Sequence, residues 1–412
     1  MKKLFFLTIA AFMALTMNAY DFMVDGLYYN ITGETTVEVT YDESYPSSLK
    51  GALEIPSSVY NEDNSTTYSV TAISEEAFYV CYKVTSVSIP STVTAIGRRA
   101  FSFCNVLTSI VVDDDNTVYD SRDNSNAIIE TASNTLISGC LNTIIPNSVT
   151  TIGQSAFEGC TNLMSIDIPN RITAIGSRAF DRCYGLMSIS LPNSITSISD
   201  STFRGCTNLT SIVIPNHVTA IGQSAFEACY ALKSIPLPSS LTSIGNKAFY
   251  ACTALTRLDI PSSLTHIGSA AFAYCENLTS VNFPYSVRRI SDYSFYRCTG
   301  LTRIEAFPNP ADISVGWNAF SEVPKDGTLH VLYKYLEAYQ TASTWSDFQN
   351  IQPFGDTDGD GIVNINDLSL IIDFLLTNDG TSINMTEYDV NGDGNISLKD
   401  VMTLIEFLLG NQ

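Results

Sequence analysis

Two acidic loops in the last 60 residues have the residue types and spacing of a calcium site. The first, at 356–367, reads DTDGDGIVNIND, and the second, at 389–400, reads DVNGDGNISLKD. A hard cation such as Ca²⁺ takes roughly six to eight oxygen ligands at about 2.4 Å, and each loop offers oxygens at alternate positions around a glycine. Gly361 and Gly394 stand sixth, where the sharp turn favours a residue without a Cβ.

The repetition of the pattern predicts two calcium sites with equivalent ligands. The residues expected to contribute a side-chain or carbonyl oxygen are Asp356, Asp358, Asp360, the Ile362 carbonyl and Asp367 in the first loop, and Asp389, Asn391, Asp393, the Asn395 carbonyl and Asp400 in the second. Asn364 and Ser397, at the ninth position, are placed to hold a water ligand.

An apolar helix is expected to leave each loop, over 366–376 and over 398–409. Shifted by the same interval as the loops, the two helices place Ile372 on Ile405 and Phe374 on Phe407. Before the first loop, the stretch IQPFG at 351–355 excludes an entering helix, because proline and glycine stand so close together. We therefore expect only exiting helices.

This loop–helix pair resembles a type I dockerin over residues 355–412. The resemblance implies a small all-α module that folds around calcium and binds a cohesin domain of a scaffold or cell-surface protein. The positions implied in cohesin binding are Ile365-Asn366 and Leu398-Lys399, where the family often has a pair of hydroxyl residues. The alternative is a calcium-stabilised C-terminal cap without a partner.

The elements that carry this module are tandem repeats of 23 residues. Successive units, from 163 to 300, begin with LMSIDIPNRITAIGSRAFDRCYG and LMSISLPNSITSISDSTFRGCTN. A period of this length predicts a solenoid, in which each unit buries its apolar face only against its neighbours. In each unit, L-x-x-I-x-I-P is expected to form a short strand closed by proline, V-T-x-I-G a second extended piece, and A-F-x-x-C a helical turn.

These units resemble the BspA-like bacterial leucine-rich repeat over about 50–320. The implied fold is an α/β repeat, a leucine-rich-repeat solenoid of short parallel strands and short helical turns, followed by the all-α dockerin. The domain organisation we expect is a signal peptide at 1–19, a β-hairpin cap at 20–50, the solenoid at 51–320 with an inserted hairpin at about 107–140, a cap or linker at 321–354, and the dockerin at 355–412.

The ten cysteines are expected to be free thiols. Nine of them follow a phenylalanine as F-x-x-C, and seven recur once per repeat from Cys160 to Cys298. Equivalent side chains of a stacked repeat point in parallel, whereas a disulfide requires two Cβ vectors that converge. Since free cysteine packs as a small apolar side chain, we predict a buried thiol ladder and no metal site among these residues.

The outward strand positions form a serine-rich stripe whose charge gathers toward its C-terminal end, with Arg257 and Asp259 followed by Arg303 and Glu305. Asp167 and Asp259 stand four repeats apart, about 20 Å at the spacing of neighbouring strands, too far for a glycosidase carboxylate pair. The histidines occupy unrelated repeat positions, so no Ser-His-Asp or Cys-His set can be assembled. We expect this face to be a binding surface at most.

Export is indicated by the first 19 residues, where Lys2 and Lys3 precede an apolar stretch too short to span a bilayer. No later stretch is long and apolar enough to be a transmembrane segment, and a net charge of −21 argues against nucleic acid as a partner. The sequence therefore predicts a secreted or cell-surface protein that binds extracellular protein or glycan, is displayed by a dockerin and is not an enzyme. The rivals are a component of a polysaccharide-degrading complex and an adhesin.

Overall fold

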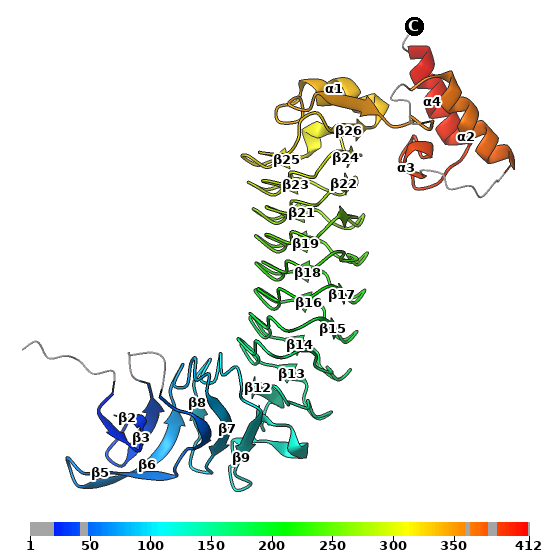
Figure 1. The fold of residues 1–412 in the computed structure, drawn as a ribbon. Helices are drawn as coiled ribbons and strands as arrows, with labels where there is room; N and C mark the ends of the chain where they lie inside the picture. The colour runs from blue at the N-terminus through cyan, green and yellow to red at the C-terminus, as the bar shows by residue number, and fades with distance from the viewer. Residues whose placement is uncertain (1–19, 42–47, 359–362, 378–384, 411–412) are drawn as a thin grey trace, which may run out of the picture.

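The computed structural model describes residues 20–41, 48–358, 363–377 and 385–410, so the predicted signal peptide lies outside the described residues. Figure 1 shows a β-rich N-terminal region, a column of stacked coils, and a small helical module beside the far end of the column. The predicted solenoid of parallel strands is confirmed. None of the helices in the described residues has both the length and the apolar character of a membrane span.

The N-terminal region is a mixed six-stranded sheet. Antiparallel pairs at its start change to parallel pairing where the first coils begin. Its strands are β1 (Phe22–Val24), β2 (Leu27–Ile31), β3 (Thr36–Thr40), β6 (Thr66–Ile73), β5 (Ser58–Asn61) and β8 (Ala95–Ile96). A second, parallel ladder runs beside it through β4 (Gly51–Glu54), β7 (Val84–Ile89) and β9 (Ser109–Val112).

Residues 107–140 interrupt the regular stack. After β10 (Tyr119–Asp120), the strands β11 (Ala127–Glu130) and β12 (Thr135–Gly139) pair antiparallel, and β12 then pairs parallel with β13 (Thr151–Ile152), which pairs with β14 (Ala174–Ile175). The buried side chains divide into two clusters at this segment, one over residues 22–140 and one over residues 127–348. The column thus contains two adjoining cores.

The regular coils contribute two rows of parallel strands. The V-T-x-I-G pieces form one row: β16 (Ser197–Ile198), β18 (Ala220–Ile221), β19 (Ser243–Ile244), β21 (His266–Ile267), β23 (Arg289–Ile290) and β25 (Ser314–Val315). The L-x-x-I-x-I-P pieces form the other: β15 (Ser188–Ser190) with β17 (Ser211–Val213), and then β20 (Arg257–Leu258), β22 (Ser280–Phe283) and β24 (Arg303–Ala306). Two strands that follow the last repeat, β26 (Thr328–Val331) and β27 (Asn350–Pro353), extend this row.

The second row lacks two of its expected strands within the described residues, the pieces that begin at Leu163 and at Leu232, and the second of these contains Pro236. Only an isolated bridge joins Ser211 to Ser234 in this repeat. Pro236 occupies the position of Val213 in the preceding strand β17, and a proline cannot donate to a ladder. A proline at this outward position therefore removes a backbone N–H donor from the strand, an effect that the repeat pattern did not predict.

The A-F-x-x-C segments form tight turns that do not continue into a helix. The Cys229 amide closes one turn on the Phe226 carbonyl at 3.2 Å, while Ala228 has a φ of 60° and donates to Tyr250 of the next coil at 2.8 Å. Phe226 likewise donates to Ala248 at 2.7 Å. Because each turn contains a residue with left-handed backbone angles, the turn cannot continue into a helix. Alternate amides of the turn therefore donate hydrogen bonds to the next coil.

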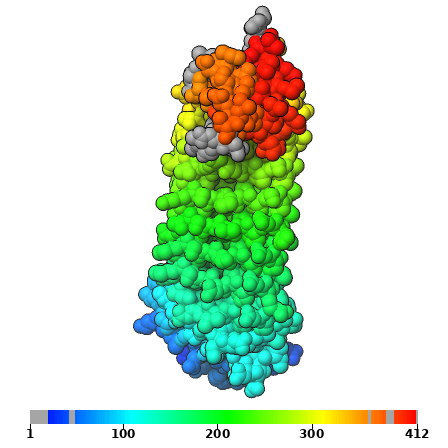
Figure 2. Space-filling model, turned by 90° about the vertical axis from the view of Figure 1, so that its right-hand side faces the viewer, coloured from blue at the N-terminus to red at the C-terminus, as the bar shows by residue number. Residues whose placement is uncertain are grey.

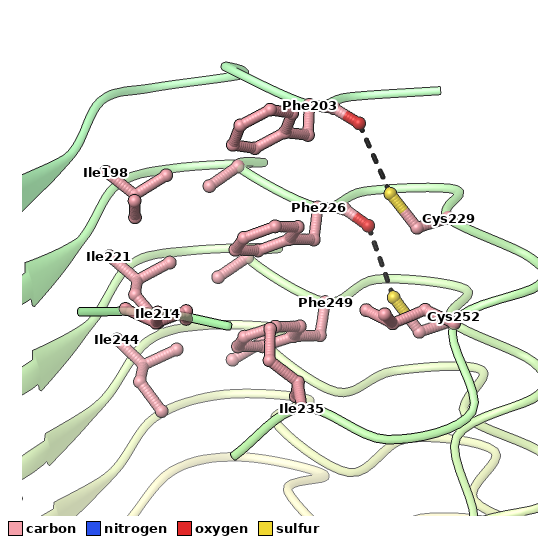
Figure 3. Packing of buried hydrophobic residues seen from close by; sticks show 14 of the residues in the cluster. Ile198, Phe203, Ile214, Ile221, Phe226, Cys229, Ile235, Ile244, Phe249 and Cys252 are labelled. Carbon is pink, nitrogen blue, oxygen red and sulfur yellow. Dashed lines mark hydrogen bonds between the residues drawn. The ribbon is translucent and has the colours of Figure 1, made fainter. Parts of the chain in front are cut away.

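The phenylalanines of these turns form a continuous stack inside the column (Figure 3). Neighbouring rings lie 5.2 to 5.6 Å apart with interplanar angles of 3 to 14°, in the series Phe157, Phe180, Phe203, Phe226, Phe249, Phe272, Phe295 and Phe320. Their spacing follows from the parallel register, which repeats each side chain at the distance between coils.

All ten cysteines are free and buried, as the sequence predicted. In seven of the coils the thiol also donates to the carbonyl of the phenylalanine one coil earlier, as Cys229 does to Phe203 at 3.2 Å (Figure 3). Burial raises the pKa of the Cys160 thiol to about 12, and the same cause raises the pKa of Cys275 to about 12.

The column ends in a short cap and the helical module. The cap contains η2 (Pro310–Asp312), η3 (Tyr333–Tyr335) and α1 (Leu336–Thr341), and it buries Tyr339 and Trp345 against the last coils. The module contains α2 (Ile365–Thr377), α3 (Met385–Tyr388) and α4 (Leu398–Gly410). Figure 2 shows it packed over the C-terminal end of the column.

Candidate metal centre

The two long helices of the module are equivalent by sequence and by packing. The bounds of α2 and α4 correspond residue by residue under the interval that separates the loops. Leu368 and Ile371 of α2 are buried, and so are their counterparts Val401 and Leu404 of α4. These side chains form one apolar core, against which Tyr333 of the cap also packs. Each loop therefore leads into a helix whose buried side chains hold it against the other helix.

The segments that enter the loops differ. As predicted, no helix enters the first loop: β27 ends at Pro353, and the chain passes directly into it. The expectation of only exiting helices is wrong for the second loop, because α3 precedes it. This single turn carries no glycine or proline, and its Glu387 and Tyr388 are buried against neighbouring elements.

The first loop brings three of its expected ligands together. Carboxylate oxygens of Asp356, Asp358 and Asp367 lie within 4.8 Å of one another. Asp367, fully buried in the first turn of α2, accepts hydrogen bonds from the Thr357 amide at 2.7 Å and the Asn364 amide at 2.7 Å. Two further expected ligands, Asp360 and Ile362, lie outside the described residues.

The second loop is organised around Asp389 and the buried Asp400. The Asp400 carboxylate accepts from the amide and side chain of Asn391 at 3.1 and 2.8 Å, and from the Ser397 amide at 2.8 Å. Asp389 accepts from the Gly394 amide at 2.7 Å. Burial raises the pKa of Asp389 above its ordinary value, so a nearby cation would stabilise its charged form.

The remaining two expected ligands of the second loop are exposed. Asp393 accepts from the Asn395 amide at 3.0 Å and lies 3.6 Å from the Lys399 ammonium. Both residues belong to the exposed tip of the loop. The structure thus joins Asn391 directly to Asp400. Asp389 instead accepts from the amides of Asp393 and Gly394, at 3.0 and 2.7 Å.

The donor set fits a hard divalent cation. Carboxylate oxygens gather in the first loop, and buried Asp367 and Asp400 are each oriented by backbone amides. Gly394 of the second loop adopts a φ of 85°, as the sharp turn requires. Oxygen ligands held by amide donors favour calcium over a metal that prefers nitrogen or sulfur.

The residues implied in cohesin binding are exposed at the first turns of the two helices. Ile365 begins α2 and is 63% exposed, while Leu398 begins α4 and is 73% exposed. Their neighbours Asn366 and Lys399 are exposed as well. Because the two large apolar side chains stand at equivalent helix starts, they are candidate contact residues.

A buried junction between the module and the column was not foreseen from the sequence. The Glu387 carboxylate of α3 accepts from Arg303 of β24 at 2.7 Å and lies 3.2 Å from His330 of β26. Burial, with the charge of Arg303, lowers the pKa of His330 to about 4, so its ring is neutral at pH 7. The one sequence signal was the charge gathered at the end of the serine-rich stripe.

Aromatic contacts extend this junction. Tyr333 of η3 meets Phe407 of α4 edge to face, with ring centroids 4.3 Å apart. Phe307 stacks on Phe354 at 4.8 Å, beside Tyr285 at 5.8 Å. The end of the column and the module therefore share an apolar contact as well as an ionic one.

The outward face of the coils keeps its polar character. Ser188 and Ser211 are exposed on their strands, and Val213 is the most exposed apolar side chain there. Along the turn edge, Tyr250, Tyr274 and Tyr296 form a chain of ring contacts 5.1 and 5.4 Å long. The rings pack on neighbouring coils, and the Arg297 guanidinium lies over Tyr274 and Tyr296. Glu322 accepts from the Tyr296 hydroxyl at 2.8 Å and from Arg297 at 2.7 Å.

Comparison with known proteins identifies both parts of the chain. A family model for the BspA type leucine rich repeat region matches in six copies over residues 55–127, 129–252 and 219–325. A model for the dockerin type I domain matches residues 354–409. Both resemblances inferred from the sequence are thereby confirmed. Neither family is catalytic, type I dockerins bind calcium, and both are typical of extracellular or cell-surface proteins.

Solved structures similar to this chain are bacterial leucine-rich repeat proteins. One from Bacteroides ovatus is 28% identical over 81% of this chain and 100% of its own, with a TM-score of 0.39. One from Eubacterium ventriosum is 25% identical over 54% and 64%, with a TM-score of 0.44. A leucine rich cell surface protein from Faecalibacterium prausnitzii is 24% identical over 74% and 98%, with a TM-score of 0.37. Curated proteins gave no match.

Proposed function

Because the chain belongs to the BspA-type leucine-rich repeat family and ends in a dockerin module, we propose that it is a non-catalytic binding protein displayed outside the cell through a cohesin. The solenoid recognises an extracellular protein or glycan on its outward face. The two loops bind two calcium ions through the ligands expected from their sequence. Residues 355–412 form the unit that attaches the solenoid to a scaffold or surface protein.

The observation that carries this proposal is the exposure of Ile365 and Leu398 at equivalent helix starts, next to the calcium loops. An apolar side chain ringed by polar and charged neighbours has the anatomy of an interface anchor. The approximate equivalence of α2 and α4 gives the module two similar faces. A cohesin can engage either the Ile365-Asn366 face or the Leu398-Lys399 face.

Calorimetry of the whole chain against a panel of type I cohesin domains tests the attachment. Binding that requires calcium and is abolished by chelation supports the proposal. If no cohesin binds in the presence of calcium, the attachment role is wrong. For the solenoid, capture of immobilised glycans and of extracellular matrix proteins separates the two ligand classes.

A second candidate function is a calcium-stabilised cap with no partner. The contacts of Glu387 with Arg303 and His330 favour this role, since they seat the module on the end of the column. An open solenoid requires its terminal apolar face to be covered. A chain that loses stability without calcium and yet binds no cohesin has this function alone.

A further inference from the structure

The Glu387 carboxylate joins three parts of the molecule at one point. One oxygen accepts from the Arg303 guanidinium of β24 at 2.7 Å and lies 3.2 Å from Nδ1 of His330 in β26. The other oxygen accepts from the backbone amides of Gly355 and Asp356 at 3.0 and 3.2 Å. The side chain is 4% exposed, so these contacts replace almost all of its water.

Glu387 lies next to the first residue of each calcium loop. Asp356 is the first residue of the first calcium loop, and Asp389, two residues after Glu387, is the first residue of the second. The carboxylate therefore fixes the start of both loops. It holds the first loop through the Asp356 amide, and it holds the second because Asp389 follows Glu387 by two residues. Its cationic partner is Arg303 of the solenoid, which also pairs with Glu305 at 2.8 Å.

A second set of contacts joins the later loop to the column. The Tyr285 hydroxyl donates to the Asn391 carbonyl at 3.2 Å. Gly392, with a φ of 73°, lies so close to Phe307 that a Cβ on it would stand 2.6 Å from the Phe307 Cδ1 atom. Asn391 is an expected ligand, so the solenoid touches the loop at a ligating residue.

We propose that the end of the solenoid is part of the calcium site: Arg303, acting through Glu387, is a positioning residue for both loops, and Tyr285 positions the second. Calcium binding and docking of the module on the column then strengthen each other. This inference rests on the proposed binding of calcium by the two loops.

Burial of the carboxylate explains why the coupling should be strong. Without Arg303, Glu387 would keep its charge in a place with almost no water, and removing one partner of a buried ion pair is costly. The Glu387 side chain relieves that cost by turning out to water, which releases the module from the column and removes the hold on the Asp356 amide. Because coupling between two binding equilibria is reciprocal, docking must favour calcium as much as calcium favours docking.

The test is a calcium titration of the full chain by calorimetry, with Arg303→Met as the main variant. Residues that orient metal ligands from behind typically change metal affinity about 10- to 100-fold, so we expect both sites to weaken by about that much. The matched control is Arg257→Met, which removes an arginine from the same strand position two repeats earlier. Arg257 pairs only with Asp259 and is 72% exposed, so its loss should leave both sites unchanged.

Two further variants keep the test decisive. Tyr285→Phe removes one hydroxyl group and should weaken the second site more than the first, even if Arg303→Met folds poorly. Glu387→Gln keeps the shape of the side chain and should weaken both sites. Hydrogen exchange gives an independent measurement, since calcium should protect the amides of β24 and β26 in the wild type and not in Arg303→Met.

The outcomes are separable. A wild type that binds no calcium overturns the proposed function together with this inference. The inference is overturned, and the proposed function stands, if the wild type binds two ions and three further results hold. Arg303→Met and Tyr285→Phe must each keep both calcium affinities within about twofold, and hydrogen exchange in β24 and β26 must not change with calcium.

Discussion

At the scale of single residues, the repeated cysteines both fill the apolar core and link neighbouring coils through hydrogen bonds. Each thiol fills a place in the apolar core, and most donate to a phenylalanine carbonyl one coil earlier, as Cys252 does to Phe226 at 3.2 Å. That carbonyl already accepts the amide that closes its own turn. Cysteine suits the position because its sulfur is apolar enough to be buried and still provides a weak donor.

The first prediction concerns the reactivity of these thiols. The thiolate is the nucleophile, and burial raises the pKa of Cys160 and Cys275 to about 12. At pH 9 an unfolded chain forms thiolates freely, whereas the folded chain should not. Alkylation followed by mass spectrometry should therefore find almost no label under native conditions and ten labels in guanidinium. Native disulfides between neighbouring coils would contradict the thiol ladder.

At the scale of elements, the sequence predicted the strands and helices that follow a residue pattern and missed the features that depend on single residues or on backbone conformation. The 23-residue units, the calcium loops and the helices α2 and α4 all appear twice or more, so their pattern could be recognised. The helix α3 and the missing strand at Pro236 depend on single residues against local neighbours. The turns at A-F-x-x-C escaped because their left-handed φ values occur at residues such as Ala228 and Arg182, which carry no sequence signal for them.

The second prediction tests the equivalence of the coils. Each regular coil meets its neighbours through the same strands and stacked rings, so removal of residues 209–231 would let the coil that begins at Leu232 stack on the one that ends before Leu209. The shortened chain should fold with unchanged strand content and a modestly lower melting temperature. Removal of half that segment, from 209 to 219, would place strands against turns and should abolish cooperative melting. Equal behaviour of the two deletions in circular dichroism would contradict the stacking register.

The third prediction follows from the paired helices. Since the two faces are equivalent, Ile365→Ala alone should change cohesin affinity little, and so should Leu398→Ala. The double variant should lose about 2–4 kcal/mol, as expected when anchors of an interface are removed. Leu376→Ala, which removes an exposed leucine at the other end of α2, is the control in the same calorimetric assay. A full loss of binding in either single variant would show that only one face is used.

At the scale of the whole molecule, the junction at Glu387 is the feature that no sequence pattern could supply. Arg303 and Glu387 stand 84 residues apart, one in the solenoid and one in the helical module. Their contact depends on how the cap directs the chain back toward the column. The two cores of the column and the core of the module are separate clusters. Separate cores predict separate unfolding transitions, joined only through the junction.

The fourth prediction is that chelation of calcium separates these transitions. The module has a small core, and the neighbouring carboxylates of Asp356, Asp358 and Asp367 repel one another, so its stability should depend on calcium. At a free calcium concentration 100-fold above Kd, each site adds about 2.7 kcal/mol, which corresponds to roughly 10 °C or more for a domain of this size. Differential scanning calorimetry should show a calcium-dependent transition of the module and a solenoid transition that moves little. The double variant Asp367→Asn with Asp400→Asn should melt like the chelated wild type. If both transitions of the wild type move together with calcium, the module and the column unfold as one unit, and if neither moves, the loops do not bind the ion.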